Sequence, residues 1–555
     1  MSLLTYHART KHRPQRYAAG PETLDWDAQP DPFRRYAGAQ QVALPLPAAQ
    51  RRTPWAALFA PGAIPPAAPT LESLGLLFEL SLALSAWKQA GPDRWAVRCT
   101  PSSGDLHPTE GYLLARGVAG LPDGLHHYTP ELHALERRAS LAAAPGTAPA
   151  LAVGLSSIHW REAWKYGERA FRYCQLDAGH ALGALRYAAA LLGWRLHDLR
   201  PGHEAIARCL GLDRPEDFAD AEPEEPDLLL AVDFGAPVEV HWQGLHDWQG
   251  RANRLDAHPM YRWPVIGEAA RASRAQAEAP ATAGSAAPST STSTSTSTST
   301  SAAAAATAPA AAPSAHADAE SLIRRRRSAQ RFDPTARMPA QRLWPLLAAL
   351  QPRRGDAAVL PWDALPQPPA VQAVLFAHRV DGLAPGAYLL PRGADGAGDG
   401  ALASLQAVLP HLDWQRVAEA PGPLWRLALH ERLPAALRTL SCHQALGAHA
   451  VFVIALLADL APVRTEPARY RALLREAGLA GQVLYLEAEA AGLAGTGIGC
   501  YFDDEVHALV GLPAEPVAGA QWQVLYHFSV GQALRDERIR TEPPYPHRSP
   551  ASPPP

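Results

Sequence analysis

The sequence predicts an α+β protein of two similar domains, which a linker joins and which pack against each other as a pseudo-two-fold pair. Its 555 residues are enough for two or three domains with cores of their own. From about Arg271 to Ala317, Ala, Pro, Ser and Thr dominate, and Ser alternates with Thr from Ser289 to Ser301. Such a tract lacks the large apolar side chains that offset the entropy of ordering. We expect domains at 1–267 and 319–550 and a disordered linker at 268–318.

A repeat relates the two domains. Three residues of the first domain recur 299 positions later, since Arg172, Gly179 and Gly193 correspond to Arg471, Gly478 and Gly492. The segments DAGHALGALRYAAALLG and EAGLAGQVLYLEAEAAG are both rich in Ala and helical in composition. Further matches follow the same order: GLPDGLHHY with GLAPGAYLL, a turn between short strands; Gly211-Leu212 with Gly511-Leu512; and the apolar strands LLLAVDFG with VLYHFSVG.

Each domain is expected to combine these strands with one long helix that is apolar almost all round. A helix without a polar face belongs in a core or at an interface. Duplicated domains often preserve the contact of an ancestral homodimer. We therefore expect the two long helices to pack together.

Composition excludes several classes of function. The formal net charge of -3 argues against a nucleic acid or another polyanion as the partner of the whole chain. No run of about twenty uncharged apolar residues predicts a membrane span, and the N-terminus lacks the apolar region of a secretory signal. Five scattered cysteines without a CxxC pair argue against a disulfide framework and a zinc site. A cytoplasmic protein without a metal site is expected.

Three segments of the second domain are candidates for binding a ligand. The run Leu322 to Phe332 places guanidinium groups beside a hydroxyl, which suits a phosphate, although a solvated basic tail would look the same. Arg538 and Arg540 form a second basic cluster, or a plain surface feature. The glycine-rich turn from Gly492 to Gly499 would let backbone approach a flat ligand. It follows a helix rather than a strand, which argues against Rossmann and P-loop folds.

Two segments of the first domain add polar groups. In Arg98-Cys-Thr-Pro-Ser-Ser-Gly-Asp-Leu-His-Pro108 a proline and two hydroxyls form a loop, or alternatively lead to a helix cap at Thr109. Lys165 and Tyr166 precede the long helix. A Lys-Tyr dipeptide of this kind is a candidate for proton transfer, or a surface pair with its stems packed on the protein.

Together these segments resemble the FMN-dependent nitroreductase family. The stretches YHARTKHRPQRY, LDWDAQPDPFRRY, KYGERAFRY and GTGIGCYFDDEVHALVGL are similar to its SagB-type dehydrogenase branch, which includes azoline oxidases. The resemblance implies nitroreductase-like domains, each an antiparallel or mixed sheet flanked by helices around a long central helix. It also implies FMN at the interface between the two domains.

The resemblance assigns roles to individual residues. It implies that the phosphate is held by Arg326, Arg327, Ser328, Arg538 and Arg540. Backbone at Gly495, Thr496 and Gly497 would face the isoalloxazine, and the opposite wall would come from Pro101, Ser102 and Ser103. Lys165 and Tyr166 match the proposed proton-transfer pair of the azoline oxidases.

Departures from the family pattern bear on the number of sites. Gln330 stands where many members have a basic residue, and Asp105 where many have Asn. The second domain has Leu360 to Pro369, without serine, in place of the Pro-Ser-Ser loop, and the first has Gly193-Trp-Arg-Leu-His-Asp in place of the glycine-rich turn. Only the site made of the Pro-Ser-Ser loop of the first domain and the glycine-rich turn of the second therefore keeps both of its walls. We expect one FMN per chain.

The expected reaction is hydride transfer between a small-molecule or peptide-borne substrate and flavin N5, for example the oxidation of an azoline to an azole. Two alternatives stay open. One is an NAD(P)H-dependent reductase of nitro or quinone compounds, as in the wider family. The other is a duplicated scaffold that has lost its flavin, although retained Arg-Arg-Ser and glycine-rich segments speak against it.

Overall fold

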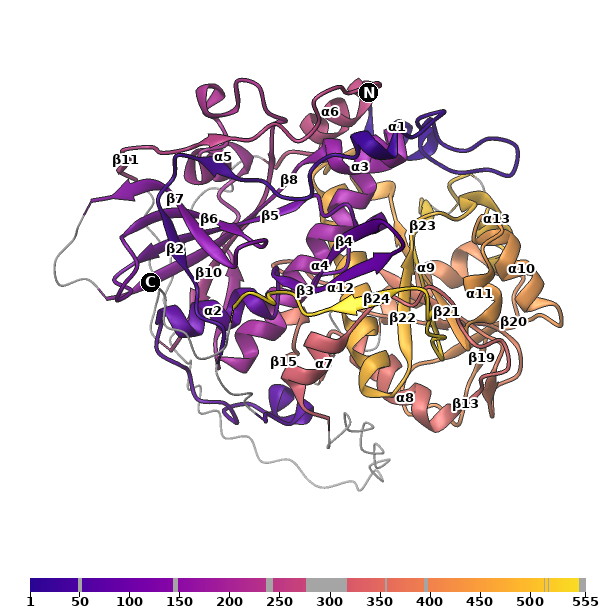
Figure 1. Ribbon diagram of the computed structural model, residues 1–555. Helices are drawn as coiled ribbons and strands as arrows, with labels where there is room; N and C mark the ends of the chain where they lie inside the picture. The colour runs from indigo at the N-terminus through magenta and orange to yellow at the C-terminus, as the bar shows by residue number, and fades with distance from the viewer. Residues whose placement is uncertain are drawn as a thin grey trace, which may run out of the picture.

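The computed structural model describes residues 1–47, 52–142, 148–235, 243–275, 317–354, 357–393, 398–513, 515–517 and 519–548. Each half of the chain builds one large sheet (Figure 1). In the first, the strand order is β11 (Leu245–His246), β7 (Ala134–Leu141), β6 (Gly124–Thr129), β5 (Thr109–Arg116), β8 (Ala150–Ser157), β10 (Glu225–Asp233) and β9 (Arg195–Asp198), with β2 (Gln41–Ala43) also paired to β7. In the second it is β19 (Gln415–Arg416), β20 (Trp425–Leu429), β18 (Gly386–Leu390), β16 (Gln372–Ala377), β21 (Phe452–Asp459), β23 (Trp522–Gly531) and β22 (Ala494–Ile498).

The two sheets confirm the repeat. The path β7-β6-β5-β8-β10-β9 of the first sheet has the same order as β20-β18-β16-β21-β23-β22 of the second, and these pairings are all antiparallel. The matched glycines Gly124 and Gly386 open equivalent strands, where an added Cβ would lie 2.0 and 2.3 Å from a neighbouring carbonyl oxygen. Gly211 and Gly511 both end a helix in the left-handed conformation.

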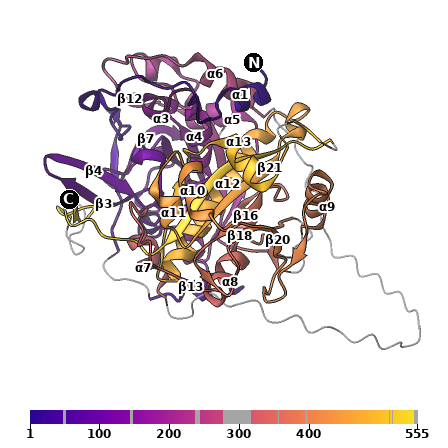
Figure 2. The same ribbon diagram turned by 90° about the vertical axis from the view of Figure 1, so that its right-hand side faces the viewer.

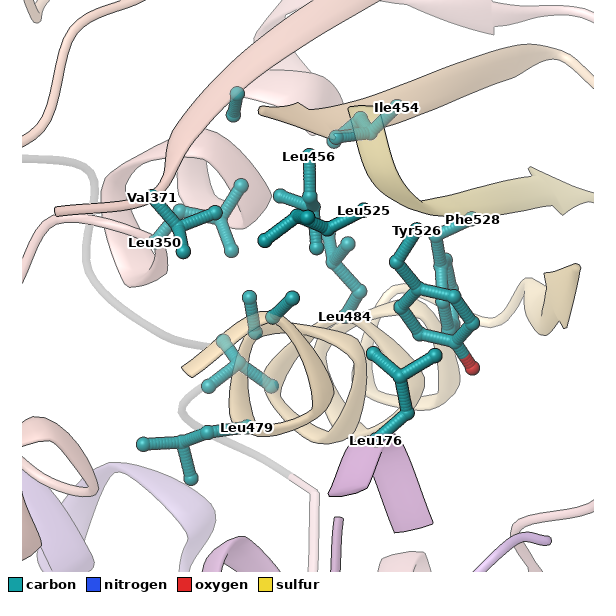
Figure 3. Close-up of a cluster of buried hydrophobic side chains, with 14 of the residues drawn as sticks. Leu176, Leu350, Val371, Ile454, Leu456, Leu479, Leu484, Leu525, Tyr526 and Phe528 are labelled. Atoms are coloured by element: carbon teal, nitrogen blue, oxygen red, sulfur yellow. The ribbon is translucent and has the colours of Figure 1, made fainter. Parts of the chain in front are cut away.

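The two long helices, α4 (Ala170–Leu191) and α12 (Arg469–Ala490), have 22 residues each and lie side by side at the centre. They cross at the matched glycines, because a Cβ on Gly179 would lie 2.1 Å from the Arg475 carbonyl oxygen and one on Gly478 2.0 Å from that of Leu176. Figure 3 shows Leu176 of α4 beside the side chains that α12 and β23 bury, among them Leu484 and Tyr526. The predicted helix pair is confirmed.

Ion pairs reach across this interface from the matched arginines. Arg172 of α4 donates to Asp503 Oδ1 at 3.1 Å, and Arg471 of α12 donates to Glu225 Oε1 at 2.6 Å. All four side chains are buried. Because removing one partner of a buried pair leaves an uncompensated charge, these contacts make the two halves depend on each other.

Terminal segments of each half are packed into the other half. The helix α7 (Ala319–Arg325) buries Leu322 and Ile323 in the core of the first half, whereas α1 (Leu3–Arg9) and α6 (Pro264–Ala272) contribute to the core of the second. Near the C-terminus β24 (Arg540–Glu542) pairs with β3 (Leu84–Ala90), which pairs with β4 (Asp93–Arg98); Figures 1 and 2 show the three together. Residues 276–316 of the predicted linker lie outside the described residues. The linker was predicted to begin at residue 268, but the helix α6 continues to Ala272.

The remaining helices cover the sheets. They are α2 (Leu71–Glu79), α3 (His159–Tyr166), α5 (His203–Leu210), α8 (Ala340–Ala349), α9 (Asp399–Val408), α10 (Leu433–Leu440), α11 (Ala445–His449) and α13 (Asp503–Val510). Short strands pair as β1 (Tyr36–Ala37) with β12 (Arg251–Ala252), β13 (Met338–Pro339) with β17 (Val380–Asp381), and β14 (Arg353–Arg354) with β15 (Ala357–Ala358). Among the described residues, no helix has the length and apolar character needed to span a membrane.

Candidate functional site

Two adjoining cavities between the halves contain most of the residues that the sequence singled out. The first, here called the glycine cavity, has about 230 Å³ and lies between the end of β22 and the loop 101–105. The second, the arginine cavity, also has about 230 Å³ and lies between residues 326–330, 533–536 and β3. Pro101, Asp105 and Ser328 line both. Together the cavities fall within the roughly 300–1,000 Å³ of small-molecule sites.

Arg326 is the central group of the arginine cavity. Its side chain is buried, with Nη2 donating to the Arg98 carbonyl oxygen at 3.2 Å and the guanidinium 4.9 Å from the centre of the Tyr485 ring. The Nε and Nη1 groups have no hydrogen-bond partner. Leaving donors of a buried cation unmet is costly. An anionic oxygen placed here would accept hydrogen bonds from these Nε and Nη1 groups.

Other cations surround the same cavity. Burial, with Arg326 nearby, lowers the pKa of Arg327 to about 10, and burial with Arg327 and Arg535 nearby lowers that of Lys88. Arg327 itself donates to the carbonyl oxygens of Arg324, Arg326 and Ser85 at 2.7–2.8 Å. It thus fixes the backbone of the loop and adds positive potential, whereas Arg326 keeps free donors.

The C-terminal basic cluster is not where the sequence predicted it. Arg538 is exposed and donates to Asp536, and Arg540 is exposed near Glu542. Neither lines the arginine cavity, whereas Arg535 does. The turn before β24 directs the later arginines outward, because pairing of β24 with β3 fixes the direction of the chain. Of these three arginines only Arg535 lines the arginine cavity, and Arg538 and Arg540 lie outside it.

The glycine-rich segment is an edge strand rather than the predicted turn. β22 pairs with β23, and the Ala329 amide donates to the Gly495 carbonyl oxygen at 3.0 Å. An added Cβ on Gly495 would lie 2.6 Å from the Phe528 ring, and one on Gly497 would lie 1.8 Å from the Tyr526 hydroxyl. Aromatic packing therefore requires these glycines. Of the three residues that the sequence singled out here, Thr496 and Gly497 line the glycine cavity and Gly495 does not.

The opposite wall is the predicted loop of Pro101, Ser102 and Ser103, which all line the glycine cavity. The Ser102 hydroxyl accepts from the His107 amide at 2.9 Å, and the Ser103 amide and hydroxyl donate to Asp177 at 3.3–3.4 Å. The chain continues into a strand, since Thr109 opens β5. The alternative of a helix cap at Thr109 is wrong.

Sequence reasoning did not single out Asp177, which lies in α4 and lines the glycine cavity. Burial raises its pKa to about 7, although hydrogen bonds from Ser102 and Ser103 oppose the shift. Glu476, 299 positions later, accepts in the same way from the amides of Ala370 and Val371. Because the equivalent acid does the same in the other half, Asp177 is a positioning residue for the loop. The sequence signal that could have identified Asp177 is the presence of an acidic residue inside an otherwise Ala-rich helix.

Lys165 and Tyr166 end α3 beside this loop. An added Cβ on Gly104 would lie 2.6 Å from the Tyr166 hydroxyl and 3.1 Å from Lys165 Nζ, so both polar ends reach the loop. Tyr166 lines the glycine cavity and packs edge-on against Tyr173 at 4.7 Å, whereas Lys165 is outside the lining and lies 5.4 Å from the Trp26 ring. Burial and the neighbouring Glu162 raise the pKa of Tyr166 well above its usual value. The phenol therefore stays protonated at neutral pH.

A larger cavity of about 690 Å³ occupies the pseudo-two-fold equivalent of the glycine cavity. Glu476 replaces Asp177, Leu228 replaces Tyr526, and residues 365–370 replace the loop 101–105. Four of the arginines that line it are paired with acids, as in Arg475 with Asp227 at 2.8 Å. The strand that corresponds to β22 here, β9, contains no glycine. Among the described residues, no group of His, Cys, Asp and Glu could hold a metal ion.

Comparisons with known proteins agree with this geometry. Residues 323–532 match the model of the nitroreductase family. A Methanocaldococcus jannaschii protein named as a candidate nitroreductase is 29% identical over 113 residues, which are 18% of this chain and 57% of that protein. The chain therefore spans little more than half the length of this curated relative.

Solved structures match over longer stretches. The crystal structure of a candidate nitroreductase from Anabaena variabilis has a TM-score of 0.65 and 21% identity, and covers 96% of this chain and 99% of that one. The Escherichia coli microcin synthetase complex with a truncated precursor covers 43% of this chain and 92% of the matched one, at 16% identity and a TM-score of 0.24, too low to argue from. The second half thus contains a nitroreductase family domain, and the whole chain has the fold of the Anabaena protein.

Proposed function

We propose that this chain, whose second half contains a nitroreductase family domain, is an FMN-dependent oxidoreductase with one flavin between its halves. The observation that carries the proposal is the unpaired, buried guanidinium of Arg326. It faces a cavity that continues past Ser328 to a wall built on β22. A phosphate would satisfy the free donors through charge-assisted hydrogen bonds.

The residues present fit FMN. Arg326, Lys88 and Arg535 supply positive charge at one end, and Ser328 links the two cavities. At the other end, Thr496 and Gly497 face the loop 101–105, and the aromatic rings of Tyr173 and Tyr526 complete the lining. When bound there, FMN would supply the two-electron chemistry of hydride transfer at its N5 position.

The protein's own part in the reaction is to position the substrate and move a proton. Oxidation of an azoline removes a proton as well as a hydride, so the task of this pair is to take up that proton. The Tyr166 hydroxyl lines the glycine cavity, and Lys165 Nζ lies against the same loop, where the two would relay the proton away from the substrate. General acid–base catalysis of this kind contributes about 10²–10⁴ in rate.

The substrate class that we propose is a small molecule or a modified peptide that gives up hydride, such as an azoline oxidised to an azole. The Lys-Tyr pair beside the cavity supports this SagB-type reaction. An NAD(P)H-dependent reductase of nitro or quinone compounds is the rival, and a flavin-free scaffold is the second. The cations of the arginine cavity, joined to a second cavity that β22 walls, favour an enzyme over a scaffold, because a scaffold needs no such combination.

Anaerobic reduction of the bound flavin tests the proposal. Purified protein should be yellow, and an azoline peptide should bleach its absorbance in single-turnover measurements. Bleaching by NAD(P)H but not by the azoline would replace the dehydrogenase with the reductase. A colourless protein that takes up no added FMN would support the scaffold instead.

A further inference from the structure

Cys442 and Cys500 lie next to each other at the rim of the glycine cavity, although 58 residues separate them in the sequence. Their sulfur atoms are 2.7 Å apart. Both thiols are partly exposed, whereas Cys99, Cys174 and Cys209 are buried. A small reagent can therefore reach this pair and not the other three. The scattered cysteines argued against a disulfide framework, and their spacing gave no sign of this contact.

The backbone around Cys442 has an uncommon conformation. Cys442 and His443, which follow α10, have φ angles of 51° and 63°. Two consecutive residues other than glycine rarely adopt this left-handed region, and such outliers persist only where the surroundings hold them. The turn brings the Cys442 side chain to Cys500, which directly follows Gly499 after β22.

The surroundings of Cys500 favour its thiolate. His12 Nδ1 accepts the Ala18 amide proton at 2.9 Å, so the neutral ring carries its own proton on Nε2 and can donate to the sulfur. Arg169, which donates to the Gly499 carbonyl oxygen at 3.1 Å, adds positive charge. The Cys442 thiol, followed by His12 and Arg169, lowers the pKa of Cys500 to about 5 against the opposing effect of burial. The pKa of Cys442 is raised in return.

We propose that Cys442 and Cys500 form a redox-active dithiol that low-molecular-weight disulfides oxidise. The Cys500 thiolate attacks one sulfur of the small disulfide, forms a mixed disulfide and releases one thiol. Cys442 then loses its proton and attacks the Cys500 sulfur, which expels the second thiol and leaves a Cys442–Cys500 disulfide. Two electrons pass from the protein to the small disulfide, and two small thiols leave with two protons.

The location of the pair gives this reaction a consequence for the cavity. Cys500 lines the glycine cavity, and so do Gln444 and Leu446, which follow Cys442 closely. The disulfide would tie the segment 442–446 to the end of β22. Oxidation therefore links two walls of the cavity covalently, and reduction frees them.

Peptide mapping of the full-length protein tests the proposal without relying on any variant. The purified protein is incubated with excess glutathione disulfide, alkylated to block the remaining thiols, and digested. We expect two of the five thiols to disappear, Cys442 and Cys500 to appear in one cross-linked peptide, and a reducing agent to restore both. Separate glutathione adducts on the two cysteines, or equal labelling of all five, would overturn the proposal.

Variants assign the order of the steps. In Cys442→Ser the resolving thiol is missing, so Cys500 should accumulate as a mixed disulfide with glutathione. In Cys500→Ser the adduct on Cys442 should form at least tenfold more slowly than the wild-type cross-link. Cys209→Ser, which removes a buried thiol elsewhere, serves as the matched control and should form the cross-link at the wild-type rate. An adduct that forms first on Cys442 would contradict the assigned order.

Discussion

At the scale of single residues, Arg326 and Arg538 carry the same charge and differ in their surroundings. Arg326 is buried with two free donors, whereas Arg538 is exposed and held by Asp536. We expect Arg326→Ala to weaken FMN binding by about 1.5–3 kcal/mol, the usual worth of a hydrogen bond to a charged group. This is roughly ten- to hundredfold in Kd, measured by quenching of flavin fluorescence. Arg538→Ala is the control and should bind FMN as the wild type does; equal losses in both would contradict the phosphate site.

A test of the proposed proton-transfer pair, Lys165 and Tyr166, must separate an effect on flavin binding from an effect on the rate of flavin reduction. Tyr166→Phe keeps the ring that packs on Tyr173 and removes only the hydroxyl, so the flavin should stay bound. We expect flavin reduction by the substrate to slow by about a hundredfold, and by a similar factor in Lys165→Ala. The double variant should lose little more, because residues that act as a unit are not additive. Stopped-flow reduction measures this, with Tyr261→Phe, a half-buried tyrosine outside both cavities, as the control. Unchanged rates would mean that the pair takes no part in proton transfer.

Residues in contiguous motifs could be singled out from the sequence, whereas those brought together by folding could not. The Arg-Arg-Ser run, the Pro-Ser-Ser loop and Tyr166 each stand in a motif, and the structure places them at two joined cavities. Cys442 and Cys500 have no common motif, because their contact arises from a turn and a strand that meet only in the fold. Arg535 was missed for a related reason, since strand pairing near the C-terminus decides which arginine faces inward.

At the scale of elements, the long helices show how a repeat predicts packing. Their matched glycines meet at the crossing, where each approaches the backbone of the other helix. Alanine normally stabilises a helix by up to about 1 kcal/mol relative to glycine. At Gly478 the added methyl would instead lie 2.0 Å from a carbonyl oxygen, which no rotamer change can relieve.

We therefore expect Gly478→Ala to destabilise the protein by about 1–3 kcal/mol, as overpacking does. The matched control is Gly400→Ala in α9, where nothing lies within 4 Å of an added Cβ and helix propensity alone acts. Differential scanning calorimetry should show a lower transition temperature for the first variant and an equal or higher one for the second. A Gly478→Ala protein as stable as the wild type would mean that the helices separate at no cost.

Elements without such a backbone constraint were predicted less accurately. The segment Gly492 to Gly499 was predicted to be a turn because glycine frees the backbone, yet its central residues, Ala494–Ile498, form the strand β22. Glycine there avoids the rings of Phe528 and Tyr526, a requirement of the neighbouring strand that composition does not reveal. By contrast, the repeat predicted two similar domains, and the two large sheets do share one strand order.

At the scale of the whole molecule, duplication leaves two equivalent cavities, and they differ in the groups that they offer a ligand. The glycine cavity has backbone on one side and hydroxyls on the other, and it joins the free donors of Arg326. The arginines that line the equivalent larger cavity include Arg471 and Arg475, which are paired with Glu225 and Asp227. Because each already holds a carboxylate, it has less to gain from a flavin phosphate than Arg326 does.

One FMN per chain is therefore expected, in contrast to the two of a symmetric homodimer. The measurement is flavin absorbance after release by heat or acid, divided by protein concentration from amino-acid analysis, on protein saturated with FMN and then dialysed. Arg326→Ala should lower the ratio toward zero, whereas Arg475→Gln, which alters only the larger cavity, should leave it unchanged provided the variant folds. A ratio near two that falls to one in Arg326→Ala would show that the larger cavity also binds flavin. Buried glycines and ion pairs hold the halves together whether one site binds flavin or two, and each half supplies one wall of the glycine cavity.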